Sequence, residues 1–548
     1  RIIEQFLYLL GIIRSMDKRV RVCILDFYTD EPSGLGVPPY VGTYQRYAYG
    51  ALSSFGKKRL VSYLTVDDLR NLSKGTFKES LVTDIKRYNL TKSVSETEEL
   101  LLKADVFVII QGILTPGKYL RAYPGSIREA VDLTKDFKAK KILFGPSGFG
   151  FGSGMQGGKL ISSALLRDIE KNFDCIITDE DYEALCEAVD MAHSNNLLKK
   201  VFVGKKSEYS LIEKCVKYSF RIIEQIPWEA IFEIESYRGC AKAKACSFCT
   251  EKIKNPTLEY RDERAILEEI KLLNKFGAIH FRIGKQSCFY SYKNMDVSAI
   301  NFLLKESASL GLKTLHIDNA NPIFVATDKG VEITKLICKY CTPGNVAAFG
   351  VESVHPEVIL RNNLGITKEL CLKAIRIINK YGSDIGDNGL PLFLPGINIL
   401  LGLIHENKEA LDYNYEFLKE ILESGLLLRR INIREVVPYP RTMLYEECKN
   451  KYLRKNRKYY YSWKRKVRVE IDNPMLQRVF PKGTILRDVL IEKRDGNNYF
   501  GRQFGTYPII VGTKEKVEIG KKYDFLVVDY MLRSLVGEVV ETLGTVKN

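Results

Sequence analysis

Length, composition and charge indicate a globular chain with a basic surface. Its 548 residues suit about two to four domains, and 45% hydrophobic with 27% charged residues excludes a disordered or fibrous protein. The net charge of +16 favours a polyanionic partner, most simply nucleic acid, although a solvated basic surface would give the same value. No apolar run reaches the ~18 residues of a membrane span, so we expect no membrane partner.

The first residues are apolar, but they do not read as a signal peptide. They lack a small-residue cleavage site, and we treat residues 1–18 as an N-terminal extension. Twelve cysteines are too few for a disulfide scaffold, and three of them crowd into ten residues. This pattern indicates a metal site in a reducing compartment, so we expect a cytoplasmic protein.

Residues 19–200 alternate short apolar runs with helical stretches. Such alternation predicts a Rossmann-like α/β domain with a parallel sheet. The strands are expected at 21–25, 59–64, 106–110, 141–144 and 175–178. Glycine-rich loops at 30–39 and 145–160 follow two of these strands and do not match a P-loop. Each is either a phosphate or substrate cradle or a flexible loop.

A second α/β series occupies residues 228–445, after a connector at 201–227. Its strands are expected at 230–235, 279–283, 314–317, 346–351, 397–403 and 430–437. Six such units favour a partial (β/α)6 barrel, in which ligands lie at the carboxyl ends of the strands. A basic helical stretch follows at 446–478. Short β-branched runs separated by glycines then predict a small β-barrel over 479–548.

Three cysteines follow directly on the first strand of the second series. Cys240, Cys246 and Cys249 lie on one loop, at the end of the strand where a barrel builds its site. Three thiolates can bind three irons of a cubane cluster and leave the fourth iron open. A structural zinc site is the alternative, but the loop contains no fourth Cys or His.

This loop resembles the CxxxCxxC loop of the radical S-adenosylmethionine (SAM) superfamily. Phe248 precedes the last cysteine, as an aromatic residue commonly does in that superfamily, whereas the first gap has five residues instead of three. The resemblance implies that a [4Fe–4S] cluster on Cys240, Cys246 and Cys249 binds SAM. Reduction then cleaves SAM to a 5′-deoxyadenosyl radical, which abstracts a hydrogen atom from the substrate.

Later strands carry further parts of the resemblance. The second strand ends where the superfamily usually has Gly-Gly-Glu, the fourth resembles its GxES segment, and the fifth resembles the segment packed on adenine. By that resemblance, the SAM-binding residues are Phe248, Gly284, Lys285, Gln286, Glu352, Ser353 and Asn398. The sixth strand alternates polar and apolar residues, so its polar face is predicted to point to substrate or to a partner.

The C-terminal module resembles a TRAM domain, a small RNA-binding barrel that radical SAM methylthiotransferases of tRNA carry in the same place. Ten Lys or Arg residues with interleaved aromatic side chains precede it, between Lys449 and Arg468. Cations neutralise phosphates and aromatic rings stack on bases, although a solvated helix whose aromatics pack inward would look alike. The predicted RNA contacts are Arg454, Arg457, Lys458, Lys464, Arg465, Lys466, Arg502 and Arg533.

The remaining cysteines receive separate predictions. Methylthiotransferases hold a second cluster in the N-terminal domain, but the spacing of Cys23, Cys175 and Cys186 does not resemble theirs. A cobalamin loop, Asp-x-His-x-x-Gly, does not occur either. Cys288 follows the second barrel strand and is the candidate catalytic residue, either meeting substrate or ligating a second cluster.

The whole layout resembles uncharacterised archaeal radical SAM proteins with a TRAM-like end. It implies a transferase-like radical SAM enzyme that modifies RNA, most simply tRNA, for example by methylthiolation or a related C–H functionalisation. Such an enzyme needs an electron donor such as ferredoxin or flavodoxin. Two alternatives stay open: a radical SAM enzyme acting on a protein or small molecule, and a non-enzymatic Fe–S protein that binds RNA.

Overall fold

The computed structural model describes residues 19–28, 40–54, 59–73, 90–111, 124–145, 162–177, 180–194, 200–202 and 205–540. The chain forms two compact units, which divide near residue 230 and are described separately. The expected extension at 1–18 and residues 30–39 and 146–160 of the glycine-rich loops lie outside the described residues. The finer predicted division, with its connector at 201–227, stays a prediction.

The first unit contains a parallel sheet of six strands in the order β3-β1-β4-β5-β6-β7. The strands are β1 (Val20–Asp26), β3 (Arg59–Thr65), β4 (Val106–Ile110), β5 (Lys140–Phe144), β6 (Cys175–Ile177) and β7 (Lys200–Phe202). The five predicted strands are therefore confirmed. The short strand β7 was missed, because three residues are too few to show a hydrophobic period. This order is that of a doubly wound α/β sheet.

Helices alternate with these strands, as the sequence predicted. A two-residue strand, β2 (Tyr40–Val41), precedes the first of them. Several helices begin at capping serines, such as Ser93 and Ser126, whose side chains accept from the backbone N–H three residues on. The helices are α2 (Thr43–Ser54), α3 (Val66–Leu72), α4 (Val94–Lys103), α5 (Ile127–Thr134), α6 (Ser163–Asn172), α7 (Tyr182–His193), α8 (Tyr209–Ser219) and η2 (Phe220–Gln225).

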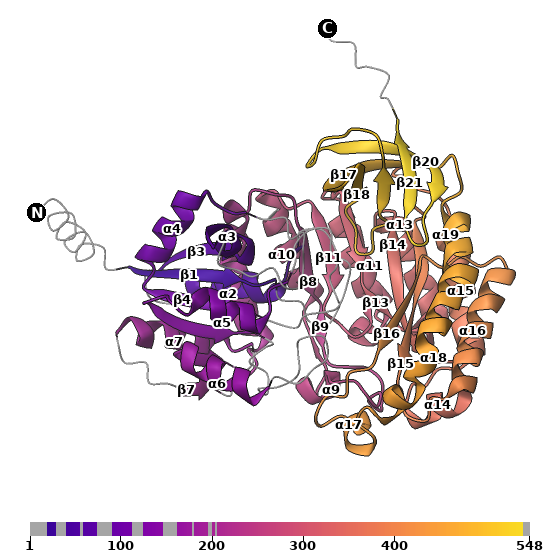
Figure 1. The fold of residues 1–548 in the computed structure, drawn as a ribbon, viewed down its shortest axis with the longest axis horizontal. Helices are drawn as coiled ribbons and strands as arrows, with labels where there is room; N and C mark the ends of the chain where they lie inside the picture. Colours follow the sequence, from indigo (N-terminus) through magenta and orange to yellow (C-terminus); the bar gives the residue numbers. More distant parts are fainter. Residues whose placement is uncertain are drawn as a thin grey trace, which may run out of the picture. The chain divides into compact units, whose positions relative to one another are not determined.

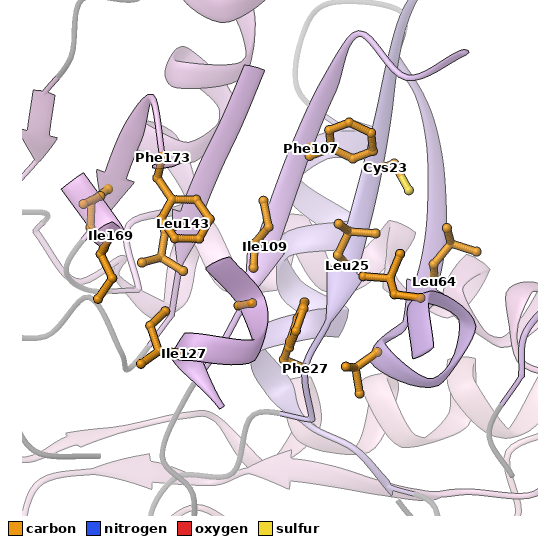
Figure 2. Packing of buried hydrophobic residues seen from close by; sticks show 14 of the residues in the cluster. Cys23, Leu25, Phe27, Leu64, Phe107, Ile109, Ile127, Leu143, Ile169 and Phe173 are labelled. Atoms are coloured by element: carbon orange, nitrogen blue, oxygen red, sulfur yellow. The ribbon is translucent and has the colours of Figure 1, made fainter. Parts of the chain in front are cut away.

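The first unit contains a large apolar core cluster on its sheet. Every residue of β4, Val-Phe-Val-Ile-Ile, is buried. Figure 2 shows Phe107 and Ile109 of β4 beside Leu25 of β1 and Leu143 of β5, with Ile127 of α5 against them. Continuous apolar strands of this kind are typical of a parallel sheet with helices on both faces. Cys23 belongs to the same cluster, and burial raises the pKa of its thiol to about 12.

The second unit contains the predicted six-strand series. The strands are β8 (Ile231–Glu235), β11 (His280–Gly284), β12 (Thr314–Ile317), β14 (Asn345–Glu352), β15 (Phe393–Leu401) and β16 (Arg430–Glu435). Neighbours pair in parallel, and β13 (Asn319–Ala320) continues β12 and carries the pairing on to β14. The partial barrel is confirmed. Strand β15 begins four residues before the predicted start at 397. The prediction missed these residues because proline and glycine, here Pro395 and Gly396, are uncommon in strands.

A helical segment follows each strand of this series (Figure 1). Two-residue strands β9 (Tyr237–Arg238) and β10 (Glu259–Tyr260) pair with each other around the cysteine loop. The helices are α9 (Glu251–Lys254), α10 (Glu263–Lys275), η3 (Phe289–Asn294), α11 (Val297–Ala308), α12 (Pro322–Val325), α13 (Asp328–Tyr340), α14 (Pro356–Arg361), α15 (Lys368–Gly382), α16 (Lys408–Glu423), α17 (Met443–Glu447), α18 (Lys451–Val467), η4 (Arg468–Asp472) and α19 (Asn473–Val479).

The C-terminal part of the second unit is a small closed barrel, drawn in yellow in Figure 1. Its strands are β17 (Ile485–Asp495), β18 (Asn498–Arg502), β19 (Val511–Thr513), β20 (Lys522–Tyr530) and β21 (Leu535–Val539). They close in the order β17-β18-β19-β21-β20, which confirms the predicted small β-barrel. In the part of the chain described here, no helix combines the length and apolar character needed to cross a bilayer.

Candidate active site at the carboxyl ends of the barrel strands

The cysteine loop begins immediately after β8 and β9. Gly239 makes the turn into it, with a φ of +92°, and a Cβ there would lie 2.6 Å from the carbonyl oxygen of Thr257. Glycine is therefore required at this position on two grounds, backbone conformation and space. The Gly239 N–H donates to Oε1 of Glu251 at 3.0 Å, which ties the start of the loop to helix α9.

The three cysteines of the loop are half-buried free thiols that influence one another. The pKa of Cys249 is raised to about 12, mainly by burial, and the nearby thiols of Cys246 and Cys240 contribute to this rise. Burial also raises the pKa of Cys246, whereas Lys242 lowers it. This mutual effect means that the loop brings the three sulfur atoms into one neighbourhood.

The donor set of this loop fits a cubane cluster, because three thiolates of one segment can bind three different irons and leave the fourth iron open. A mononuclear zinc site would need a fourth donor, and the loop contains no fourth Cys or His. Cys240, Cys246 and Cys249 are the residues that would hold the cluster.

Lys242 anchors the lengthened first half of the loop. Its ammonium donates to Sγ of Cys246 at 2.9 Å and to the carbonyl oxygens of Asn363 and Leu364 at 2.9 and 2.8 Å. A cation beside a sulfur atom favours the thiolate, which is the form that binds a metal. The five-residue gap between Cys240 and Cys246 therefore holds a lysine that serves the site.

Asn362 fixes the second half of the loop. Its Oδ1 accepts from Oγ of Ser247 at 2.6 Å and from the N–H of Ile404 at 3.1 Å, while its Nδ2 donates to the carbonyls of Val358 and Ile404 at 2.8 and 3.0 Å. The Ser247 N–H donates to the Asn362 carbonyl at 3.0 Å. One buried amide thus joins the cysteine loop to helix α14 and to the end of β15.

Glu352 ends strand β14 in a strained conformation beside an unusual glycine. Its φ is +64°, and the pairing with β15 shifts register between Gly350 and Glu352. Left-handed backbone at a non-glycine residue tends to mark functional sites. A Cβ on Gly350, whose backbone is exposed, would lie 2.9 Å from Oε1 of Glu352.

The Glu352 carboxyl is a candidate for recognising a ligand. Burial raises its pKa to about 8, although Arg434 and Lys242 act in the opposite direction. Within the described residues, no hydrogen bond or ion pair engages this carboxyl. The carboxyl is half-buried and has no direct partner, so hydroxyl or ammonium donors of a ligand would stabilise it.

The other predicted SAM-binding residues occupy the same strand ends but are more internally engaged. Gln286 is buried, accepts from Oγ of Ser236 at 3.3 Å and donates to the Ile283 carbonyl at 3.0 Å. Gly284 ends β11, and Lys285 has a φ of +57° and lies 3.8 Å from a carboxylate oxygen of Glu235. The side chains of Gln286 and Lys285 are therefore engaged within the protein at the end of β11. A contact between these residues and SAM stays a prediction.

Three further predicted positions differ in exposure. Phe248 is half-buried within the loop, and Ser353 is buried with its Oγ donating to Oδ1 of Asn414 at 3.2 Å. Asn398 is half-buried, and its Oδ1 accepts from Nδ2 of Asn432 at 3.0 Å across the β15–β16 pair. Of these, Asn398 lies on the polar face of the sheet.

The predicted catalytic residue Cys288 is buried, with 3% of its surface exposed. Its sulfur accepts from the N–H of Asn321 at 3.3 Å, and the Tyr237 hydroxyl bonds both its N–H and its carbonyl. Burial raises the pKa of the thiol to about 11. These contacts are those of a structural cysteine rather than of a group that meets substrate.

The predicted RNA contacts divide into exposed and internal residues. Arg502 is 3% exposed and its Nε lies 2.6 Å from Glu492, so the structure removes it as an RNA contact because it belongs to the interior of the small barrel. Lys464 and Arg533 pair with Glu435 at 2.8 Å and Asp472 at 3.3 Å. The exposed members on α18 are Arg454, Arg457, Lys458, Arg465 and Lys466.

The aromatic residues of α18 also divide. Tyr460 and Trp463 are buried, with the Tyr460 hydroxyl on Glu406 and the Trp463 N–H on the Leu411 carbonyl at 2.7 Å. Tyr461 is 78% exposed on the basic side. The alternative in which aromatic residues pack inward is thus right for two of them and wrong for Tyr461.

Two residues that anchor the loop, Lys242 and Asn362, were not among the predicted site residues. The bonds from Lys242 to the Asn363 and Leu364 carbonyls, and the bond between Asn362 and Ser247, join residues more than a hundred positions apart, which no local pattern reveals. The alternation of β16 predicted a polar face, which carries Arg430 and Arg434, without saying which of its residues matter.

No protein-family model matches the chain. The uncharacterized protein MJ0274 of Methanocaldococcus jannaschii is 43% identical over 547 residues, covering 95% of this chain and 94% of its own. An uncharacterized protein of Archaeoglobus fulgidus is 36% identical over 529 residues, covering 94% and 89%. The expected likeness to uncharacterised archaeal proteins is confirmed.

Similar solved structures include several radical SAM enzymes. The methyltransferase TsrM of Kitasatospora setae, solved with tryptophan and a SAM analogue, matches 78% of this chain and 75% of its own at 12% identity and a TM-score of 0.48. The cobalamin-dependent enzyme OxsB matches 73% and 52% at 14% identity and a TM-score of 0.49. These likenesses are too distant to carry an argument about activity. On the sequence identities, the chain belongs to the same family as the two archaeal proteins from M. jannaschii and A. fulgidus.

Proposed function

We propose that this protein is a radical SAM enzyme whose [4Fe–4S] cluster is held by Cys240, Cys246 and Cys249. The observation that carries the proposal is the placement of these three free thiols on one anchored loop, at the carboxyl end of the first strand of a six-strand parallel barrel. When bound, the cluster would supply the electron that cleaves SAM to a 5′-deoxyadenosyl radical.

The chain's own residues support SAM binding beside that loop. The Glu352 carboxyl lies close enough to Lys242 for the two charges to interact, and it is unpartnered within the described residues. It would accept hydrogen bonds from the hydroxyls or the ammonium of SAM. Gly350 leaves exposed backbone beside that carboxyl, which is how a strand admits a close ligand.

Anaerobic reconstitution tests this proposal. The wild-type chain should bind about four irons, absorb near 400 nm and, after reduction, release 5′-deoxyadenosine from SAM. Cys246→Ala should lose both the absorbance and the cleavage. Cys448→Ala is the matched control, because Cys448 is also half-buried and free but lies beyond α17. SAM cleavage by Cys246→Ala would refute the assignment.

We further propose that the substrate is an RNA, most simply a tRNA, recognised in part by α18. Supporting it is the exposed side of that helix, where Arg454, Arg457, Lys458 and Arg465 accompany the exposed ring of Tyr461. Arginine and lysine can neutralise the backbone phosphates of RNA, and an exposed ring can stack on an unpaired base.

Charge reversal on α18 tests the RNA proposal. The variant Arg454→Glu/Arg457→Glu/Lys458→Glu should weaken tRNA binding by about a hundredfold or more at low salt and flatten its salt dependence. Lys373→Glu/Arg376→Glu/Lys380→Glu on α15 carries the same charge change on exposed residues and should bind as the wild type does. Equal losses in the two variants would contradict the proposal, and comparing RNA nucleosides from cells with and without the protein would identify the modified base.

A further inference from the structure

The polar face of β16 carries two half-buried arginines. Residues alternate along a strand, so Arg430, Asn432 and Arg434 share one face. The hydrogen bond between Asn432 and Asn398 of β15 confirms the side on which this face lies. The charges of Glu352, at the end of β14, and Arg434 interact. Glu352 also interacts with Lys242, so it connects this polar face with the cysteine loop.

Arg430 packs on a tyrosine of the small barrel, which is in turn bonded to a residue just beyond β12. Its guanidinium lies 4.1 Å from the ring centroid of Tyr507, a residue between β18 and β19 of the small barrel. The Tyr507 hydroxyl donates to Oδ1 of Asp318, just beyond β12, at 2.8 Å. Gly396 provides room, because a Cβ there would lie 2.7 Å from Cγ of Arg430.

Neither Arg430 nor Arg434 forms a direct ion pair with a carboxylate within the described residues, although Asp318 acts on Arg430 and Glu352 on Arg434 at longer range. Other buried arginines of this unit do form such pairs: Arg238 with Glu235 at 3.0 Å, Arg261 with Glu269 at 2.6 Å and Arg282 with Glu233 at 2.6 Å. The two guanidiniums are half-buried and act on each other, and burial together with Arg434 and Arg533 lowers the pKa of Arg430. Neighbouring like charges that no carboxylate contacts directly repel each other, and an anionic ligand would offset that repulsion.

We infer that Arg430 and Arg434, with the amide of Asn432 between them, form a binding site for an anionic group of the substrate, a phosphate or a carboxylate. Two guanidiniums on one face can present several N–H donors to such a group. The inference rests on the proposed function, because it assigns this group to the substrate of the same barrel. Its position next to Glu352 would hold the substrate beside SAM.

The site is tested by anion binding to the reconstituted full-length protein. Calorimetry at low salt with inorganic pyrophosphate and with malonate distinguishes a phosphate from a carboxylate. At least one probe should bind the wild type, and Arg430→Gln and Arg434→Gln should each weaken that binding about tenfold or more. Arg376→Gln, on the exposed side of α15, should bind within about twofold of the wild type.

Two further measurements separate the possible failures. In the ligand-free protein, Arg434→Gln should leave the thermal midpoint within about 2 °C of the wild type, because the repulsion from Arg430 and the attraction to Glu352 are lost together, whereas loss of a structural arginine would lower it further. If both glutamine variants bound the anion as tightly as the wild type does, the proposed site would be wrong. A loss confined to SAM affinity would also overturn the site, because it would assign the pair to the SAM carboxylate. Failure of the wild type to cleave SAM would instead refute the proposed function.

Discussion

The parallel sheets of the two units differ in the side chains that their strands bury. In the first unit every residue of β4 is apolar and buried, and Leu25 and Ile109 pack in one cluster. In the second unit the face shared by Glu233, Arg282 and Asp318 is charged although these side chains are buried. Apolar strands suit a sheet that helices cover on both faces, whereas a barrel keeps one face for the polar side chains of its site.

This difference predicts how much stability a substitution in each sheet should remove. Buried charges stabilise little on balance, but each becomes very unfavourable when its partner is removed. Apolar contacts are lost gradually, by an amount that depends on the atoms deleted. The variants below test this difference, beginning with the largest expected effect.

Glu233→Leu should destabilise the protein by about 3 kcal/mol, because it removes the carboxylate 2.6 Å from Arg282 and leaves the more distant Asp318, at 3.8 Å, as its ion-pair partner. Ile109→Val in the apolar sheet should lose only about 0.5–1.5 kcal/mol. Denaturant unfolding of the two full-length variants measures both values. If Glu233→Leu were as mild as Ile109→Val, the buried ion pair would not be the element that distinguishes the barrel.

Asn362→Ala should lose about 3 kcal/mol, because it removes the partner of Ser247 and of three backbone groups in the interior. It should also lower the iron bound per chain after reconstitution. Asn363→Gly is the control, since that amide makes one contact at 3.6 Å with the sulfur of Met443 and glycine tolerates the φ of +52° at this position. Normal iron content in Asn362→Ala would show that the loop does not depend on this anchor.

Glu352→Gln should stabilise the ligand-free protein at high pH. The folded pKa, about 8, lies above the ordinary value of 4.5, so the carboxyl favours folding below pH 4.5 and this contribution is lost as pH rises to 8 and beyond. The glutamine variant should therefore gain about 2 kcal/mol over the wild type above pH 8 and little at pH 5. Parallel unfolding at the two pH values provides the check, and a pH-independent difference would contradict it.

Lys242→Met should have the smallest effect on stability, about 1 kcal/mol, and a clear effect on the cluster. Removing the ammonium 2.9 Å from Sγ of Cys246 should make the reduction potential more negative, because reduction adds negative charge. Redox titration followed by electron paramagnetic resonance measures the shift. Lys252→Met, which removes an exposed lysine that contacts only the Ala243 carbonyl at 2.9 Å, should leave the potential unchanged.

Much of the fold could be predicted because it depends on local pattern. Apolar runs such as 106–110 and 314–317 matched β4 and β12 residue for residue. The start of β15 was missed because Pro395 and Gly396 are unfavourable in strands and are accommodated only by pairing with β14. The cysteine loop was predictable for the same reason as the strands, since its three thiols lie within one short segment.

The sequence by itself determined where the thiols lie along the chain, the alternation of elements and the polar face of β16. The tertiary structure alone decided which polar residues matter there. Arg502 and Arg430 look alike in sequence, yet one is neutralised by Glu492 inside the small barrel and the other rests on Tyr507 without a carboxylate partner in the described residues. Charge pairing depends on distance in space, and residues 77 positions apart in the chain come into contact only when the sheet and the small barrel have formed.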